Sequence, residues 1–170
     1  MTNYRRSFVP GGSCFFTVNL ADRSSRLLTD HTDLLRTAFR YAHVRHAFID
    51  AIVILPDHLH AIWSLPEGDA DFATRWRHVK ATFSRALPTC ERISECRLRK
   101  GERGIWQRRY WEHTLRDERD FSRHVDYIHF NPVKHGLVTR VEDWPYSSFH
   151  QMVRLGGTQK TGVETRRRAA

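Results

Sequence analysis

The chain has 170 residues, a formal net charge of +9 and three cysteines. This length supports one domain with a substantial core, and the odd, scattered cysteines argue against a disulfide framework or a structural zinc site built on cysteines. No stretch approaches the roughly 18 apolar residues of a membrane span, and the N-terminus does not resemble a secretory signal. The charge is typical of a protein that binds a polyanion, either a nucleic acid or an anionic membrane surface.

The hydrophobic pattern alternates between strand-like and helix-like stretches. β-branched and aromatic runs predict strands, and apolar residues three and four positions apart behind a capping residue predict helices. In chain order we expect a strand at 13–20, a helix from Asp30 or Thr32 to about 46, a strand at 48–55, a turn at Pro56-Asp57, a strand at 58–65, a helix at 72–87, an irregular polar stretch at 88–103, one or two strands within 105–115, a helix at 117–131 and a short helix at 147–153.

The order of these elements predicts the fold. Strand, helix, strand, strand, helix, strand matches the split β-α-β arrangement, so we expect an α+β, ferredoxin-like sandwich with an additional C-terminal helix. Residues 13–153 are expected to form a single domain, between a basic N-terminal arm at 1–12 and a disordered basic tail at 154–170. Because this fold hosts many functions, the function has to be argued from particular residues.

Two histidines stand one residue apart in the stretch Pro56-Asp57-His58-Leu59-His60. Residues two apart on a strand point to the same face, so His58 and His60 project together while Leu59 points into the core. Two imidazoles side by side on an open sheet face can share one divalent ion. The alternative is that two surface histidines alternate with core residues by chance.

The last long predicted helix carries a tyrosine off its apolar face. Phe121, Val125 and Ile128 form the stripe that is expected to pack on the sheet. Tyr127 lies outside this stripe, and Asn131 follows it by about one turn on the same side. Such a tyrosine is available to react or to bind, although packing of its ring is the commoner role.

These two groups of residues make chemical sense together. A tyrosine hydroxyl, whose ordinary pKa is about 10, is a poor nucleophile unless a metal or a base assists it. A divalent ion held by His58 and His60 can polarise a phosphodiester, with the Asn131 amide oxygen as a third ligand. Mg²⁺ prefers oxygen ligands and Mn²⁺ accepts both oxygen and nitrogen, so the choice between them stays open.

Longer stretches of the chain resemble a known family. His58-Leu59-His60 followed by Tyr127–Val138 (YIHFNPVKHGLV) resembles the REP-associated tyrosine transposases, which are bacterial members of the single-tyrosine HUH transposase superfamily. Supporting stretches are Asn3–Arg6, Trp106–His113 and Trp144–Phe149. The resemblance covers roughly residues 3–150.

The resemblance implies a ferredoxin-like core that binds and nicks single-stranded DNA at short palindromic hairpins between genes. Tyr127 would be the catalytic nucleophile and would form a 5′-phosphotyrosine link, which releases a 3′-hydroxyl. His58, His60 and Asn131 would hold Mg²⁺ or Mn²⁺. Related transposases often have glutamine where this chain has Asn131, so the shorter side chain is a departure from the pattern.

Several residues outside this set are candidates for DNA contacts. Arg5 and Arg6 lie on the arm, where the resemblance implies contacts with a short single-stranded tag beside the hairpin. Phosphate contacts or plain solvated charges are expected at Lys80, Arg85, Arg108 and Arg109. Stacking on unpaired bases or core packing is expected at Trp106, Tyr110 and Trp111. Glu112 and His113 either support the metal site or lie on the surface.

The resulting hypothesis is a metal-dependent endonuclease and strand transferase that acts on repetitive extragenic palindromic hairpins. One alternative is a non-catalytic protein that binds hairpin DNA or RNA on the same fold. Another is a metal-dependent hydrolase that uses water as its nucleophile. Other transposases of the superfamily are dimers that exchange tyrosine helices, but no exposed apolar stripe demands a dimer here, so we expect a monomer rather than a homodimer. We expect it in the bacterial cytoplasm on the nucleoid, without a membrane partner.

Overall fold

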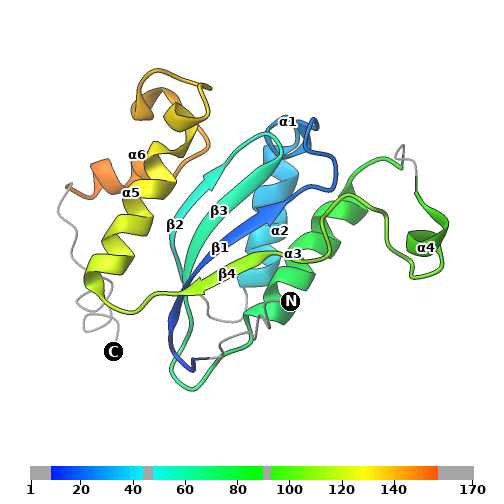
Figure 1. The fold of residues 1–170 in the computed structure, drawn as a ribbon, viewed down its shortest axis with the longest axis horizontal. Coiled ribbons are helices and arrows are strands. Elements are labelled where there is room, and N and C mark those ends of the chain that lie inside the picture. Colours follow the sequence, from blue (N-terminus) through cyan, green and yellow to red (C-terminus); the bar gives the residue numbers. More distant parts are fainter. Residues whose placement is uncertain (1–8, 44–47, 90–92, 157–170) are drawn as a thin grey trace, which may run out of the picture.

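A four-stranded antiparallel sheet forms the centre of the molecule in this computed structural model, which describes residues 9–43, 48–89 and 93–156 (Figure 1). The strands are β1 (Ser13–Asn19), β2 (Phe48–Ile54), β3 (His58–Ser64) and β4 (Trp111–Thr114). They lie in the order β2-β3-β1-β4, and each neighbouring pair is antiparallel. This is the strand order of the split β-α-β sandwich, so the predicted fold class is confirmed.

Two helices cover one face of the sheet. They are α2 (Thr32–His43), which follows the short α1 (Leu27–Asp30), and α3 (Phe72–Ala86). Their apolar side chains pack against those that β3 directs to this face, which include Leu59 and Trp63. Trp63 stacks on Trp76 of α3 with 4.2 Å between the ring centroids. The alternation predicted for β3 is therefore confirmed on the side that Leu59 occupies.

The opposite face is covered by α5 (Glu118–Lys134), which Figure 1 shows on the other side of the sheet from α2 and α3. Val125 and Ile128 pack there in a core with Phe15 and Ile62, as the predicted apolar stripe requires. The Asp117 carboxylate caps the first turn by accepting the Asp120 N–H at 2.8 Å.

The end of α5 differs from the prediction, because the helix runs past residue 131 and through Pro132 to Lys134. Proline lacks an N–H, but this close to the C-terminus it removes only one helical hydrogen bond. The His135 N–H still donates to the Asn131 carbonyl at 3.0 Å. Gly136, with φ of 68°, then closes the helix. The extension matters because it brings Lys134 and His135 alongside the sheet.

The remaining elements are short. They are α4 (Glu95–Leu98), the 3-10 turn η1 (Val141–Asp143) and α6 (Phe149–Arg154). α4 lies in a stretch that was predicted to be irregular. Of the predicted strand region 105–115, only residues 111–114 join the sheet. Trp106 instead packs in the core and pairs with Leu20 through a single bridge. Residues 1–8 and 157–170, which include most of the predicted arm and tail, lie outside the described residues, so those boundaries stay predictions. No helix in the described part of the chain has the length and apolar character needed to cross a membrane.

Candidate active site and nucleic-acid interface

His58 and His60 lie side by side on β3, with 5.1 Å between their ring centroids. The predicted open sheet face is wrong: the two side chains point to the face that α5 covers, and their exposed fractions are only 5% and 4%. Every residue of β3 is buried, because helices pack on both faces of the sheet. The histidine pair is therefore sheltered from bulk solvent.

Burial favours the neutral form of both imidazoles. It lowers the pKa of His58, although the Asp57 carboxylate lies 2.8 Å from the ring Nδ1. Burial, together with the neighbouring His58 and His135, lowers the pKa of His60 to about 3. A neutral imidazole retains the lone pair that a metal ion requires, so the pair can bind a cation without first losing protons.

Hydrogen bonds orient the two rings. His60 Nδ1 lies 2.9 Å from Thr17 Oγ1, and Asp57, which contacts His58 Nδ1, is itself held by Arg23 at 2.7 Å. Partners on Nδ1 leave Nε2 as the ligand atom of each ring. His60 Nε2 is buried and has no hydrogen-bond partner among the described residues.

Asn131 presents the same kind of unpaired atoms from α5. Its side chain is 0% exposed, and neither amide atom has a hydrogen-bond partner in the described part of the chain. An unpaired buried polar group costs about 1–3 kcal/mol, so such a group calls for an explanation. An ion bound by Asn131 Oδ1 and the histidine Nε2 atoms would satisfy the unpaired Oδ1 and His60 Nε2, but not the amide nitrogen, which is a donor. The donor atoms of these three residues therefore suit a metal ion, and their role as its ligands stays a prediction.

Tyr127 lies one helical turn before Asn131, at the edge of this buried pair. Its ring centroid is 5.2 Å from that of His60 and 5.9 Å from that of Phe15. Its side chain is 39% exposed, so a substrate can reach the ring from solvent. The structure thus brings Tyr127, His58 and His60 together at the interface between α5 and β3.

Two neighbours of this site were missed at the sequence level. Lys134 places its Nζ 5.0 Å from the centroid of the Tyr127 ring, and the His135 ring lies 5.2 Å from that of His58. His135 matches no ligand spacing in the sequence. The available signal was helical: residues seven and eight positions after Tyr127 return to its face if the helix continues through Pro132.

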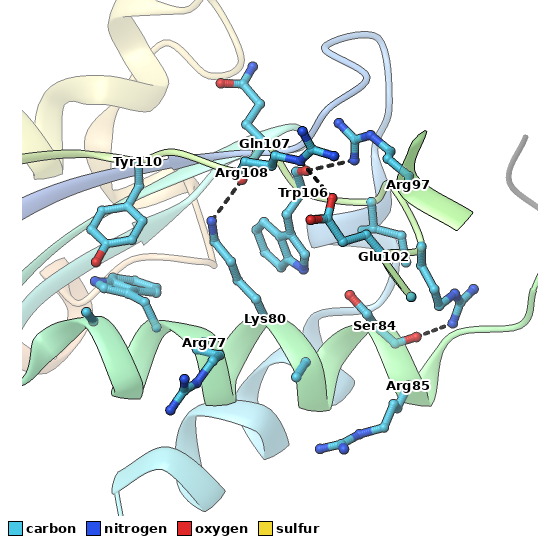
Figure 2. A pocket seen from close by; sticks show the side chains of 17 residues that line it. Arg77, Lys80, Ser84, Arg85, Arg97, Glu102, Trp106, Gln107, Arg108 and Tyr110 are labelled. Carbon is cyan, nitrogen blue, oxygen red and sulfur yellow. Dashed lines mark hydrogen bonds and ion pairs between the residues drawn. The ribbon is translucent and has the colours of Figure 1, made fainter. Parts of the chain in front are cut away.

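A cavity of about 580 Å³ lies between α3 and the segment 97–110 (Figure 2). Three of the predicted phosphate contacts line it: Lys80, Arg85 and Arg108. Arg109 is exposed but does not line it, and Arg5 and Arg6 lie outside the described residues. The lining also includes three arginines that were not predicted: Arg77, Arg97 and Arg103. The cavity therefore gathers positive charge from two separate stretches of chain.

The positively charged side chains of this cavity differ in the hydrogen bonds and ion pairs that they make within the protein. Lys80 donates to the Gln107 carbonyl at 3.0 Å, and Arg108 pairs with Glu102 at 2.8 Å, as the dashed lines in Figure 2 show. Arg85 is exposed and makes no hydrogen bond or ion pair with the described residues. Arg85 is therefore the lining residue best placed to contact a phosphate.

The three aromatic residues considered for base stacking also differ in their exposure. Trp106 is buried and Tyr110 packs against the same core, so both rings serve packing. Trp111 is 49% exposed and stacks on His113 with 7° between the ring planes. Of the three candidates, Trp111 is the one available to stack on an unpaired base.

No protein-family model matches the chain, but whole-length relatives do. An Escherichia coli K12 protein named REP-associated tyrosine transposase is 47% identical over 157 residues, which cover 92% of this chain and 87% of that protein. A Haemophilus influenzae protein given the same family name is 48% identical over 156 residues, covering 91% and 89%. This chain belongs to the REP-associated tyrosine transposases.

A solved structure of this transposase family supports the same conclusion. It is described as a REP-associated tyrosine transposase bound to a REP hairpin, is 47% identical, and matches with a TM-score of 0.80 over 92% of this chain and 87% of that one. The family predicted from the sequence is confirmed, and so is the fold that the family implies.

Acid is expected to destabilise this transposase through His129 of α5. The ring is buried, with Nε2 3.0 Å from Ser148 Oγ, and burial lowers its pKa to about 4. An unfolded histidine has a pKa of about 6.5. Between pH 4 and pH 6.5 the unfolded state therefore binds more protons than the folded state. The free energy of unfolding should therefore decrease as the pH is lowered through this range, by up to about 1.4 kcal/mol per pH unit for this residue.

Urea denaturation from about pH 7 to about pH 4.5 checks this expectation. The free energy of unfolding should depend less steeply on pH in the His129→Gln variant than in the parent chain. The substitution removes the contribution of His129 and leaves those of the other titrating groups. Parallel pH profiles for the two proteins would contradict it.

Proposed function

We propose that this chain is a metal-dependent single-strand DNA endonuclease and strand transferase that acts on repetitive extragenic palindromic hairpins. The observation that carries the proposal is the half-exposed Tyr127 ring, 5.2 Å from the ring of the buried, neutral His60. The hairpin substrate is supported by the relative whose structure is described as bound to a REP hairpin.

His58, His60 and Asn131 would hold the divalent ion, either Mg²⁺ or Mn²⁺. When bound, such an ion supplies positive charge that polarises the scissile phosphate. Three neutral ligands leave that charge uncompensated by the protein. The unpaired His60 Nε2 and Asn131 Oδ1 support this assignment.

The reaction we propose is a transesterification at Tyr127. Its hydroxyl oxygen attacks the scissile phosphorus, and the phenolic proton passes to water. The bond to the upstream 3′-oxygen breaks, and this leaving oxygen takes a proton from water to become a 3′-hydroxyl. The product is a 5′-phosphotyrosine, and attack by a 3′-hydroxyl on this ester rejoins a strand without ATP. Lys134, with its Nζ 5.0 Å from the Tyr127 ring centroid, places positive charge where the phenolate develops.

The site is built from one copy of the chain. Tyr127 lies against His60 of the same molecule, so no exchange of tyrosine helices is needed to complete it. This arrangement favours a tyrosine that acts in its own subunit, and the monomer stays a prediction. The location in the bacterial cytoplasm stays a prediction.

The test uses single-stranded REP hairpin oligonucleotides labelled at the 5′ or the 3′ end, incubated with Mn²⁺ or Mg²⁺. A denaturing gel should show a covalent protein adduct on the fragment 3′ of the cut and a free 3′-hydroxyl on the other fragment. Cleavage without an adduct would indicate water as the nucleophile. Binding without cleavage in either metal would favour the non-catalytic hairpin-binding protein.

Replacing Arg85 with alanine is expected to weaken binding of matched and scrambled hairpins alike, because phosphate contacts carry no sequence information. Losing one such contact should lower the slope of log affinity against log salt concentration by about one. Fluorescence anisotropy at several salt concentrations measures this slope. Arg40→Ala, on α2 and lining a different cavity, is the control that should change nothing. A loss confined to one hairpin sequence would argue against a phosphate contact.

A further inference from the structure

A second cluster of metal-ligating side chains lies apart from His58 and His60. It consists of His113 on β4 with Asp120 and His124, one turn apart on α5. One ligand atom of each residue lies within 4.8 Å of the others. Their side chains are 22–23% exposed, so an ion from solvent can reach them. None of these three residues belongs to the catalytic site proposed above.

The Asp120 carboxylate joins the cluster. Its Oδ2 lies 3.0 Å from His113 Nε2, and its Oδ1 lies 3.2 Å from His124 Nδ1. Ligand atoms about 2.0–2.1 Å from a tetrahedral Zn²⁺ are about 3.3 Å from one another. The two imidazoles stack at 5.1 Å, with 23° between their planes, so both rings approach the same carboxylate. The two distances to Asp120 are therefore close to that spacing, and all three ligand atoms lie within 4.8 Å of one another.

Two backbone contacts bear on how these ligands would bind. The Arg116 N–H donates to Asp120 Oδ2 at 3.2 Å, which orients the carboxylate as contacts around metal ligands commonly do. His124 Nδ1 also lies 2.8 Å from the Asp120 carbonyl oxygen. For Nδ1 to bind an ion, the neutral ring has to carry its proton on Nε2 instead. This is a change of tautomer, which involves no change in charge.

We propose that His113, Asp120 and His124 form a binding site for a transition-metal ion, with Zn²⁺ as the best-matched ion. Two imidazoles and one carboxylate suit Zn²⁺, and the nitrogen ligands disfavour Mg²⁺ and Ca²⁺, which take oxygen. Three protein ligands on a partly exposed site leave the fourth position to water. The proposal does not depend on the nuclease function.

The position of the cluster indicates what a bound ion does. His124 packs against the Phe15 ring at 4.8 Å, and Phe15 in turn stacks on His60 at 5.4 Å. Tyr127 follows His124 by three residues on α5. An ion held between β4 and α5 therefore ties the first half of the tyrosine helix to the sheet, one aromatic ring away from the candidate active site.

The test is a Zn²⁺ titration by calorimetry of the full chain after chelator treatment, in a His58→Ala/His60→Ala background. This background should bind one equivalent. Adding Asp120→Asn or His124→Gln should weaken that binding by more than about tenfold. His78→Gln, which removes an exposed histidine on α3, should leave it unchanged.

Thermal unfolding provides a second readout and reports whether each variant folds. Zn²⁺ should raise the melting temperature of the background protein and of its His78→Gln derivative, but not of the derivatives altered at Asp120 or His124. If the His58→Ala/His60→Ala protein does not fold, the titration is done with the unaltered chain. That chain should bind two equivalents of Zn²⁺, and its Asp120→Asn variant should bind one. Absence of Zn²⁺ binding, or binding indifferent to Asp120 and His124, would overturn the proposal.

Discussion

Replacing Tyr127 with phenylalanine is expected to abolish the covalent protein–DNA adduct while hairpin affinity stays unchanged. The substitution removes only the hydroxyl, and the ring keeps its contacts with Phe15, His60 and Lys134. Because the nucleophile itself is lost, strand cleavage should fall by at least about 1,000-fold. Labelled hairpins on a denaturing gel measure cleavage, and anisotropy measures binding.

The matched control is Tyr41→Phe, which removes an exposed hydroxyl from α2 and should leave both measurements unchanged. Cleavage that persists in Tyr127→Phe would show that another group or water attacks the phosphate. Loss of hairpin binding in the same variant would instead give Tyr127 a role in holding DNA.

Replacing Asn131 with leucine is expected to have opposite effects on stability and on the metal response. In the metal-free protein, the buried amide has two unpaired atoms, whose cost leucine of similar size removes. The free energy of unfolding should therefore rise by about 1–3 kcal/mol in chelator. The same change deletes a proposed ligand, so Mn²⁺ should raise the melting temperature of the parent protein but not of the leucine variant.

Asn131→Gln is the comparison for this experiment, because it retains an amide oxygen and should retain a response to Mn²⁺. Melting temperatures in chelator and in Mn²⁺ are measured for all three proteins. A leucine variant that is less stable in chelator would show that the amide is satisfied in the metal-free state. An unchanged response to Mn²⁺ would remove Asn131 from the ligand set.

Local patterns explain why much of the candidate site could be predicted. A strand directs His58 and His60 to one side and Leu59 to the other, whatever packs on it, because its period is two residues. The helical stripe of Val125 and Ile128 likewise separates the packed face of α5 from Tyr127. These relations depend only on neighbours in the chain, so the sequence contains them.

Other features depend on which surfaces meet, and these escaped prediction. The burial of the histidine pair follows from α5 covering their face, and their lowered pKa values follow from that burial. The position of Lys134 over Tyr127 required the helix to pass through Pro132, although proline usually indicates a helix end.

The sequence by itself determined the order of the four sheet strands and the long helices, the family, and the types of residue that carry the proposed chemistry. These follow from short-range periodicity and from motifs. Only the tertiary structure decided that His113, left open between support and surface, meets Asp120 and His124, and that arginines from α3 and from 97–110 line one cavity. Packing of segments far apart in the chain sets these contacts, and a residue pattern carries no distance between such segments.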